Sequence, residues 1–130
     1  MDSKDTYAFA ERLMRQVWEP LDSTNVPQFY HRDVAGHHDG YHGSQNLTYY
    51  DVVNCLDWDK QTFSNPIYDI QDIIAAESKF AVRFIYTANL IATREEVRAE
   101  AAYFYHLRDG KISEFWLLSD TDFDYKQKPS

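Results

Sequence analysis

The first part of the chain has apolar residues at helical spacing, whereas the second part has them at alternate positions. Near the N-terminus, Phe9, Leu13 and Val17 fall on one face of a helix, and Pro20 ends the pattern. We therefore predict an amphipathic first helix over about 5–19.

Between these two parts the pattern changes twice. The residues around 24–31 predict a second, short helix. The stretch VAGHHDGYHG at 34–43 holds three glycines and three histidines, which suits a short strand over about 34–38 followed by an irregular loop. Helical spacing then returns and predicts a third helix over about 44–59.

From Pro66 onward, long runs rich in β-branched and aromatic residues are separated by short turn signals. These runs predict four strands, over about 66–76, 79–92, 95–108 and 111–122. Helices first and a meander of strands second is typical of an α+β domain, with helices packed on one face of a curved antiparallel sheet. We expect one such domain over 1–130, because 130 residues suffice for a single core.

Composition excludes several classes of function. Hydrophobic residues make up 44% of the chain and aromatic residues 16%, which argues against a disordered protein. The net charge of −8 argues against nucleic acid or an anionic membrane as a partner, and no apolar run approaches the roughly 18 residues of a membrane span. The single Cys55 cannot form an internal disulfide, and the N-terminal residues show no signal peptide, so we expect a cytoplasmic protein.

The turn Arg108-Asp109-Gly110 decides which residues of the last two strands share a face. A two-residue turn pairs Arg108 with Lys111, whereas a turn with Gly110 as a bulge residue pairs Leu107 with Lys111. We favour the bulge form, because the residues after Gly110 then resume a clean alternation.

This register places His106 opposite Ile112 and Asp120 opposite Arg98. His106 and Asp120 then lie roughly 26 Å apart along the strands, which is too far for a hydrogen-bonded pair. One face of the hairpin carries Tyr103, Tyr105, Phe115 and Leu117. The other carries Phe104, His106, Ile112, Trp116 and Leu118, and we expect this second apolar face to meet another protomer.

Three segments carry a resemblance to a known family: HRDVAGHHDGYHG at 31–43, FSNPIYDIQDIIAAESKFAVRF at 63–84 and FYHLRDGKISEFW at 104–116. With the order of elements, they resemble the nuclear transport factor 2-like superfamily, in its SnoaL-like polyketide cyclase and ketosteroid isomerase branch. The resemblance implies a cone-shaped half-barrel. Its sheet is wrapped around the N-terminal helices and a pocket, and the protein is usually a homodimer.

The chain departs from the cyclases at their acid–base centre. In that family a histidine seven residues before the glycine of the turn and an aspartate seven residues after it move protons, and the matching residues here are Tyr103 and Leu117. Leucine cannot move a proton, which disfavours an aldol cyclase that uses this aspartate. The resemblance also implies that the face with Tyr103 lines the pocket.

In the ketosteroid isomerases the base is a carboxylate on the strand after the second helix, and either His38 or Asp39 matches it. An imidazole titrates near neutral pH, so His38 is a candidate general base, with Tyr103 as hydrogen-bond donor to a developing oxyanion. The other interpretation is that these histidines are polar turn residues. His37, Asp39 and His42 match no strong zinc pattern, so we expect neither a metal nor a cofactor.

The pocket residues expected from this orientation are mostly aromatic: Trp18, Tyr30, Phe84, Tyr86, Tyr105, Phe115 and Leu117. They suit an apolar small molecule, although core packing is the other interpretation of the same residues. Three functions remain open: a cofactor-free isomerase, cyclase or hydratase acting on an apolar carbonyl compound, a non-catalytic ligand-binding protein, and a dimeric interaction module.

Overall fold

The computed structural model describes residues 2–40 and 43–119, and it describes their side chains except at 39, 40 and 43–45. The helical elements lie mainly in the first half of the chain. They are α1 (Ser3–Leu13), a π-helical turn (Met14–Trp18), a 3₁₀ turn (Ser23–Asn25), α2 (Val26–Phe29) and α3 (Tyr49–Thr62). The strands are β1 (Tyr30–Gly40), β2 (Gly43–Leu47), β3 (Phe63–Ala75), β4 (Lys79–Leu90), β5 (Glu96–Arg108) and β6 (Lys111–Ser119).

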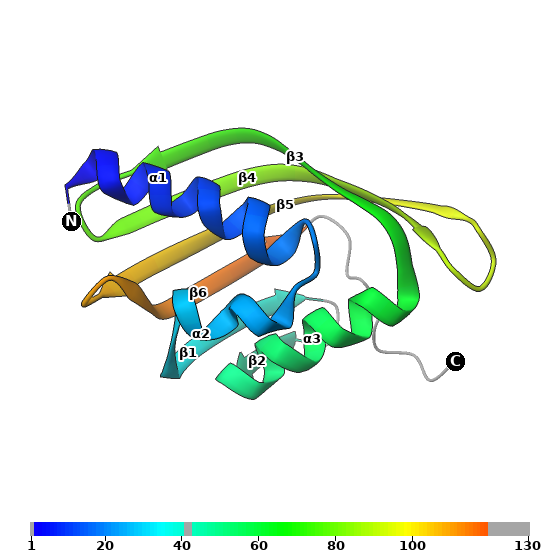
Figure 1. The fold of residues 1–130 in the computed structure, drawn as a ribbon, viewed down its shortest axis with the longest axis horizontal. Helices are drawn as coiled ribbons and strands as arrows, with labels where there is room; N and C mark the ends of the chain where they lie inside the picture. Colours follow the sequence, from blue (N-terminus) through cyan, green and yellow to red (C-terminus); the bar gives the residue numbers. More distant parts are fainter. Residues whose placement is uncertain (1, 41–42, 120–130) are drawn as a thin grey trace.

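The strands form one curved sheet in the order β2-β1-β6-β5-β4-β3, with α1, α2 and α3 on one of its faces (Figure 1). This is the α+β half-barrel that the sequence predicts. The prediction of an antiparallel sheet is wrong at one place, because β1 and β6 pair in parallel. None of the helices in the described part of the chain is long and apolar enough to cross a membrane.

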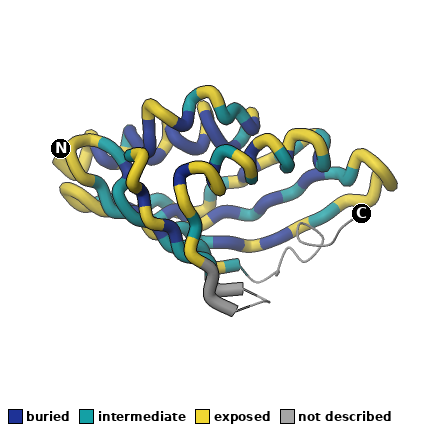
Figure 2. The backbone as a smooth tube through the Cα atoms, turned by 90° about the horizontal axis from the view of Figure 1, so that it is seen from below, coloured by how far each residue is buried: buried dark blue, intermediate teal, exposed yellow. Residues whose placement is uncertain are grey.

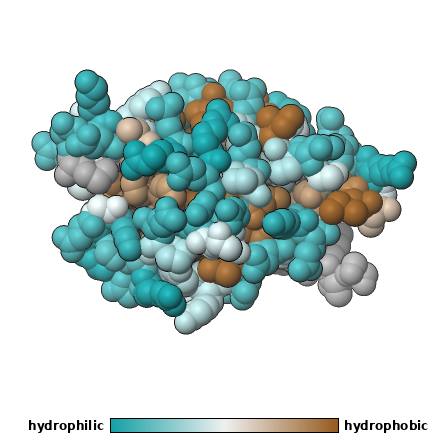
Figure 3. All heavy atoms as spheres, in the orientation of Figure 1, coloured by the Kyte–Doolittle hydropathy of each residue, from teal (hydrophilic) through white to brown (hydrophobic). Residues whose placement is uncertain are grey.

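The core lies between the helices and the concave face of the sheet. Buried and exposed residues alternate along the central strands, and the inward positions are buried under the helices (Figure 2). The largest fully buried side chains include Tyr30, Tyr105, Leu13 and Met14. Seen from the helical side, the surface is mainly hydrophilic, and its hydrophobic side chains lie in small separate groups (Figure 3).

The region between the first and third helices differs from the prediction. The second helix ends at Phe29 rather than 31, because Tyr30 already pairs with Ile112 of β6. Residues 43–47 form β2 instead of the start of a helix. The third helix starts after Thr48, whose hydroxyl accepts a hydrogen bond from the backbone N–H of Asp51, while the Asp51 carboxylate accepts one from the backbone N–H of Thr48. Such a capping box fixes the first turn of a helix.

The predicted register of the last hairpin is wrong. Arg108 pairs with Lys111, and Asp109 and Gly110 both have positive φ angles, as in a two-residue turn. The irregularity lies instead between His106 and Leu107, so His106 faces Glu114. Ile112 therefore lies opposite Leu107 and is completely buried, rather than on the outer face.

Beyond this bulge, the residues of β5 and β6 lie on the faces of the sheet that the sequence predicts. Tyr105 pairs with Phe115 and Tyr103 with Leu117, all on the concave side of the sheet, whereas Phe104 and Trp116 lie on the convex side. Asp120, the predicted partner of Arg98, lies outside the described residues.

Candidate active site

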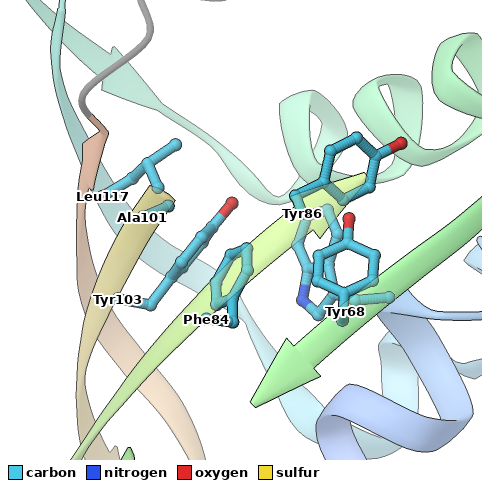
Figure 4. Close-up of a pocket in the computed structure, with 7 residues that line it drawn as sticks. Tyr68, Phe84, Tyr86, Ala101, Tyr103 and Leu117 are labelled. Atoms are coloured by element: carbon cyan, nitrogen blue, oxygen red, sulfur yellow. The ribbon is translucent and has the colours of Figure 1, made fainter. Parts of the chain in front are cut away.

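A small cavity lies between the helices and the sheet. Its wall consists of Trp18, Tyr68, Phe84, Tyr86, Ala101, Tyr103 and Leu117, most of them from β3, β4 and β5 (Figure 4). The cavity has a volume of about 20 Å³. This is space for about one water molecule, whereas pockets that hold drug-sized ligands measure roughly 300–1,000 Å³. A larger ligand can enter only if side chains of the wall move.

Trp18 reaches the cavity from the π-helical turn at the end of α1. In this turn the backbone N–H of Glu19 donates to the carbonyl of Met14, which is the wider spacing of a π-helix. The Trp18 indole N–H donates a hydrogen bond to the Tyr30 hydroxyl at 3.2 Å. This bond fixes the indole ring against the ring of Tyr103, at a centroid distance of 5.8 Å.

Tyr103 stands at the centre of an aromatic stack. Its ring lies 5.7 Å from that of Phe84, 5.6 Å from that of Tyr105 and 6.4 Å from that of Phe115. Contacts on several sides hold the Tyr103 ring in one orientation. Its hydroxyl lies beside the rings that form the wall (Figure 4). The Leu117 side chain, directly opposite in register, completes this part of the wall.

Tyr68 and Tyr105, which are buried, and Tyr103, which is half-buried, are hydrogen-bond donors rather than bases. Burial raises the pKa of Tyr68, Tyr103 and Tyr105 well above the ordinary value, because a phenolate loses its hydration there. Their hydroxyls therefore stay protonated at neutral pH. A protonated tyrosine can stabilise negative charge on a ligand oxygen.

Five of the residues predicted for the pocket line the cavity: Trp18, Phe84, Tyr86, Tyr103 and Leu117. Tyr30, Tyr105 and Phe115 are instead buried side by side next to the wall, with Phe115 6.0 Å from each of the two tyrosine rings. They support the wall without lining it.

Sequence reasoning missed Tyr68 and Ala101 as wall residues. Tyr68 pairs with Tyr86 across β3 and β4, and their rings are 4.8 Å apart. Two register shifts in β3, one on either side of the segment 67–70, break the simple alternation of inward and outward side chains. Alternation counted along the whole strand therefore does not identify Tyr68 as a residue of the concave face.

His38 lies on β1 between Gln45 of β2 and Leu117 of β6. Strand alternation puts its side chain on the same face as Gly36, which contacts the ring of Phe115, and its Nε2 atom is buried. His38 is thus next to a residue of the cavity wall without lining the cavity itself. Asp39 pairs through its backbone with Leu118, but its side chain lies outside the described part of the chain.

The other histidines of the predicted loop do not join this site. His37 is on the convex face, where Nε2 lies 2.7 Å from the Glu114 carboxylate and the ring stacks on Trp116. His42 lies outside the described residues. Within 2–40 and 43–119, no group of three histidine, cysteine, aspartate or glutamate side chains is arranged to hold a metal ion.

One buried carboxylate was not predicted. Asp59 of α3 has no exposed surface, and the Cys55 thiol, one turn earlier, lies 3.9 Å from its Oδ2. The sequence does contain a signal for it. Asp59 continues the spacing of Tyr49, Val52 and Leu56, which are the buried residues of this helix.

The convex face carries an apolar surface that includes Phe104, Trp116 and Leu118. Phe104 is 43% exposed and Leu118 45%. The Trp116 ring lies between the rings of His37 and His106, at centroid distances of 5.3 and 4.7 Å.

Comparison with known proteins decides the family. The family model described as SnoaL-like polyketide cyclase matches residues 8–126. The chain belongs to the SnoaL-like polyketide cyclase family. No curated protein matches it significantly.

Solved structures of this SnoaL-like fold are close in shape and distant in sequence. AclR from Streptomyces galilaeus superposes with a TM-score of 0.80 at 16% identity, over 98% of this chain and 89% of AclR. IdmH from Streptomyces antibioticus gives 0.73 at 16% identity, over 98% of this chain and 100% of IdmH. An NTF2-like protein from Burkholderia xenovorans gives 0.76 at 11% identity, over 98% and 99% of the two chains. At these identities the likeness shows the fold alone, which this chain shares with the NTF2-like protein.

Proposed function

We propose that this SnoaL-like protein binds an apolar carbonyl compound in the cavity beside Tyr103 and moves a proton on it without a cofactor. The observation that carries the proposal is the position of Tyr103, a wall residue on β5 whose pKa burial keeps far above neutral pH. The aromatic wall supplies apolar surface, and the hydroxyl supplies a donor for a carbonyl oxygen.

In the proposed reaction, His38 or Asp39 takes a proton from the carbon next to the carbonyl group. The electron pair of the broken C–H bond forms a C=C bond, and the carbonyl oxygen becomes an enolate oxygen that accepts the Tyr103 hydrogen bond. Return of the proton to the same carbon restores the substrate, and return to a conjugated carbon gives an isomer. Strand alternation supports His38 in this role, because it shares the concave face with Gly36.

This function is tested by exchange of substrate protons with solvent. The probe is 2-tetralone, an apolar ketone with acidic protons beside its carbonyl group, and deuterium uptake from heavy water is followed by proton NMR. We expect the protein to accelerate uptake above the uncatalysed rate. Tyr103→Phe and His38→Ala should each lower the rate by roughly 10- to 1,000-fold.

The matched control is Tyr105→Phe, which removes a buried hydroxyl from the same strand and face but not from the cavity wall. It should retain the exchange activity. Acceleration that survives both Tyr103→Phe and His38→Ala would contradict the proposed roles.

A second candidate function is ligand binding without catalysis. Leu117 favours it, because this residue places an inert side chain directly opposite Tyr103 in the wall. Tight binding of 2-tetralone together with no acceleration of deuterium uptake would support the binding protein over the enzyme.

We also propose that the protein is a homodimer through the convex sheet face, supported by the exposed side chains of Phe104 and Leu118. Sedimentation velocity should show a dimer, and Phe104→Glu with Leu118→Glu should convert it to a monomer. Tyr50→Glu, at a still more exposed aromatic residue on α3, is the control that should remain dimeric. The expected cytoplasmic location stays a prediction, which cell fractionation tests.

A further inference from the structure

Trp18 differs from the other residues of the cavity wall in the element that carries it. The other wall residues project from β3, β4, β5 and β6, where the hydrogen-bonded ladders of the sheet hold the backbone in place. Trp18 projects instead from the helical layer that covers the sheet (Figure 1). If one wall residue moves to admit a ligand, Trp18 is the one whose backbone the sheet does not fix.

The backbone that carries Trp18 already departs from a regular α-helix. The backbone N–H of Glu19 donates to the carbonyl of Met14, five residues earlier, at 2.9 Å, whereas in an α-helix it would donate to Arg15. One residue more in a turn amounts to a rotation of roughly 100° for the residues that follow, since an α-helix has 3.6 residues per turn. A return to α-helical bonding would therefore turn Trp18, the last residue of the π-helical turn, away from the wall.

A second disfavoured conformation lies shortly after Trp18. Leu21 has a φ angle of 53°, in the left-handed region that side chains with a Cβ atom rarely adopt. Its side chain is 3% exposed, so packing rather than backbone preference keeps it there. Trp18 thus belongs to a segment with two backbone conformations that persist only because tertiary contacts favour them. A ligand that replaces some of those contacts can shift such a segment to another arrangement.

One side-chain hydrogen bond holds Trp18 in the wall. The indole N–H donates to the Tyr30 hydroxyl at 3.2 Å, which is longer than the roughly 2.9–3.0 Å typical of such a bond. Beside it, the indole makes a tilted ring contact with Tyr103 at 5.8 Å. An apolar ligand can take over the contact with the Tyr103 ring, and water can accept the indole N–H once the ring has moved outward.

We infer that Trp18 is the gate of this cavity, the wall residue whose indole moves outward to admit a ligand. In the closed state, which this structure shows, the indole occupies space that a ligand needs, and the cavity measures about 20 Å³. In the open state the hydrogen bond to Tyr30 is broken and the turn Met14–Trp18 changes toward α-helical bonding. The vacated space lies against Tyr103, so the size of the indole sets how large a group the site can take beside the Tyr103 ring.

This inference rests on the proposed function, since it assumes that the cavity beside Tyr103 is the ligand site. It adds a step to that function. Opening at Trp18 must precede or accompany binding, so its frequency limits the rate at which a ligand enters.

The first test follows Trp18 in the wild-type chain with 2-tetralone as the ligand. Labelling with 5-fluorotryptophan places one ¹⁹F nucleus on each of the three tryptophans, and Trp58→Phe and Trp116→Phe identify the Trp18 resonance by elimination. At saturating 2-tetralone this resonance should move and acquire a shift difference between H₂O and D₂O, because the ring becomes exposed to solvent. The resonances of Trp58 and Trp116, which do not line the cavity, should stay in place.

The second test removes the hydroxyl that holds the indole. Tyr30→Phe should raise the association rate constant of 2-tetralone about 2- to 10-fold in stopped-flow tryptophan fluorescence, because loss of one hydrogen bond makes the open state more populated. Tyr49→Phe is the matched control. It removes the hydroxyl of another buried tyrosine, on α3 and outside the wall, and should bind at the wild-type rate. If Tyr30→Phe does not fold, the ¹⁹F measurement on the wild type decides alone.

Three results would overturn the inference. If 2-tetralone binds while the Trp18 resonance stays shielded from solvent, or if Tyr30→Phe binds at the wild-type rate, Trp18 is not the gate and the proposed ligand site stands. Equal acceleration in Tyr49→Phe also overturns it, because the effect would then not depend on the bond to Trp18. Failure of every form, the wild type included, to bind 2-tetralone overturns the proposed ligand site and the gate with it.

Discussion

Gly36→Ala tests how the aromatic core fixes the position of β1. A Cβ atom at Gly36 would overlap the end of the Phe115 ring. That ring is 2% exposed and lies between the rings of Tyr30 and Tyr105, so it has no free space into which to move. Overpacking of this kind costs about 1–3 kcal/mol, and removal of a strand glycine returns about 0.5–1 kcal/mol. We expect a net loss of about 1–2 kcal/mol in the free energy of unfolding.

Urea denaturation followed by tryptophan fluorescence measures this loss. For a protein of this size it corresponds to a fall in the midpoint of roughly 0.5–1 M. Phe115→Leu removes the ring atoms that the new Cβ would meet, so Gly36→Ala should cost much less in that background. A neutral Gly36→Ala, or an equal cost in both backgrounds, would refute the close contact between β1 and the Phe115 ring.

Two further predictions concern the buried hydroxyls. Trp18→Phe removes the hydrogen-bond donor to the Tyr30 hydroxyl and should lower the free energy of unfolding by about 1–3 kcal/mol. In a Tyr30→Phe background the same change should cost much less. An equal cost in both backgrounds would show that this hydrogen bond contributes nothing to stability. Burial raises the pKa of Tyr105 above its ordinary value of 10.0, so the unfolded chain releases this proton first as the pH rises. The contribution of Tyr105 to the free energy of unfolding should therefore be retained below about pH 10 and fall by about 1.4 kcal/mol per pH unit above it. Denaturation at a series of alkaline pH values measures the slope, which should be smaller in Tyr105→Phe, and an equal slope in the two proteins would contradict the assignment.

The sequence predicts the class of fold and the inward direction of Tyr103 and Tyr105, because strand alternation survives a change of register by two residues. It does not predict the register itself. The bulge sits beside His106 rather than at Gly110, and this difference moves Ile112 from the outer face into the core. Turn residues alone do not distinguish the two forms, since Asp followed by Gly suits both.

Strand alternation also made part of the candidate site predictable. Regular alternation along β4 and β5 identifies Phe84, Tyr86 and Tyr103, whereas the irregular β3 hides Tyr68. Asp59 was missed because charged residues are usually assigned to the solvent-facing side of a helix, although its spacing from Val52 and Leu56 places it on the buried side.

The most direct measurement of the central claim is an NMR titration of the chain, labelled with ¹³C in its tyrosine rings, with 2-tetralone. If the ligand binds in the cavity, the resonances of Tyr68, Tyr86 and Tyr103 should shift together, while those of the exposed Tyr7 and Tyr50 stay in place. Shifts confined to Tyr7 and Tyr50, or no shifts at saturating ligand, would contradict a ligand site beside Tyr103.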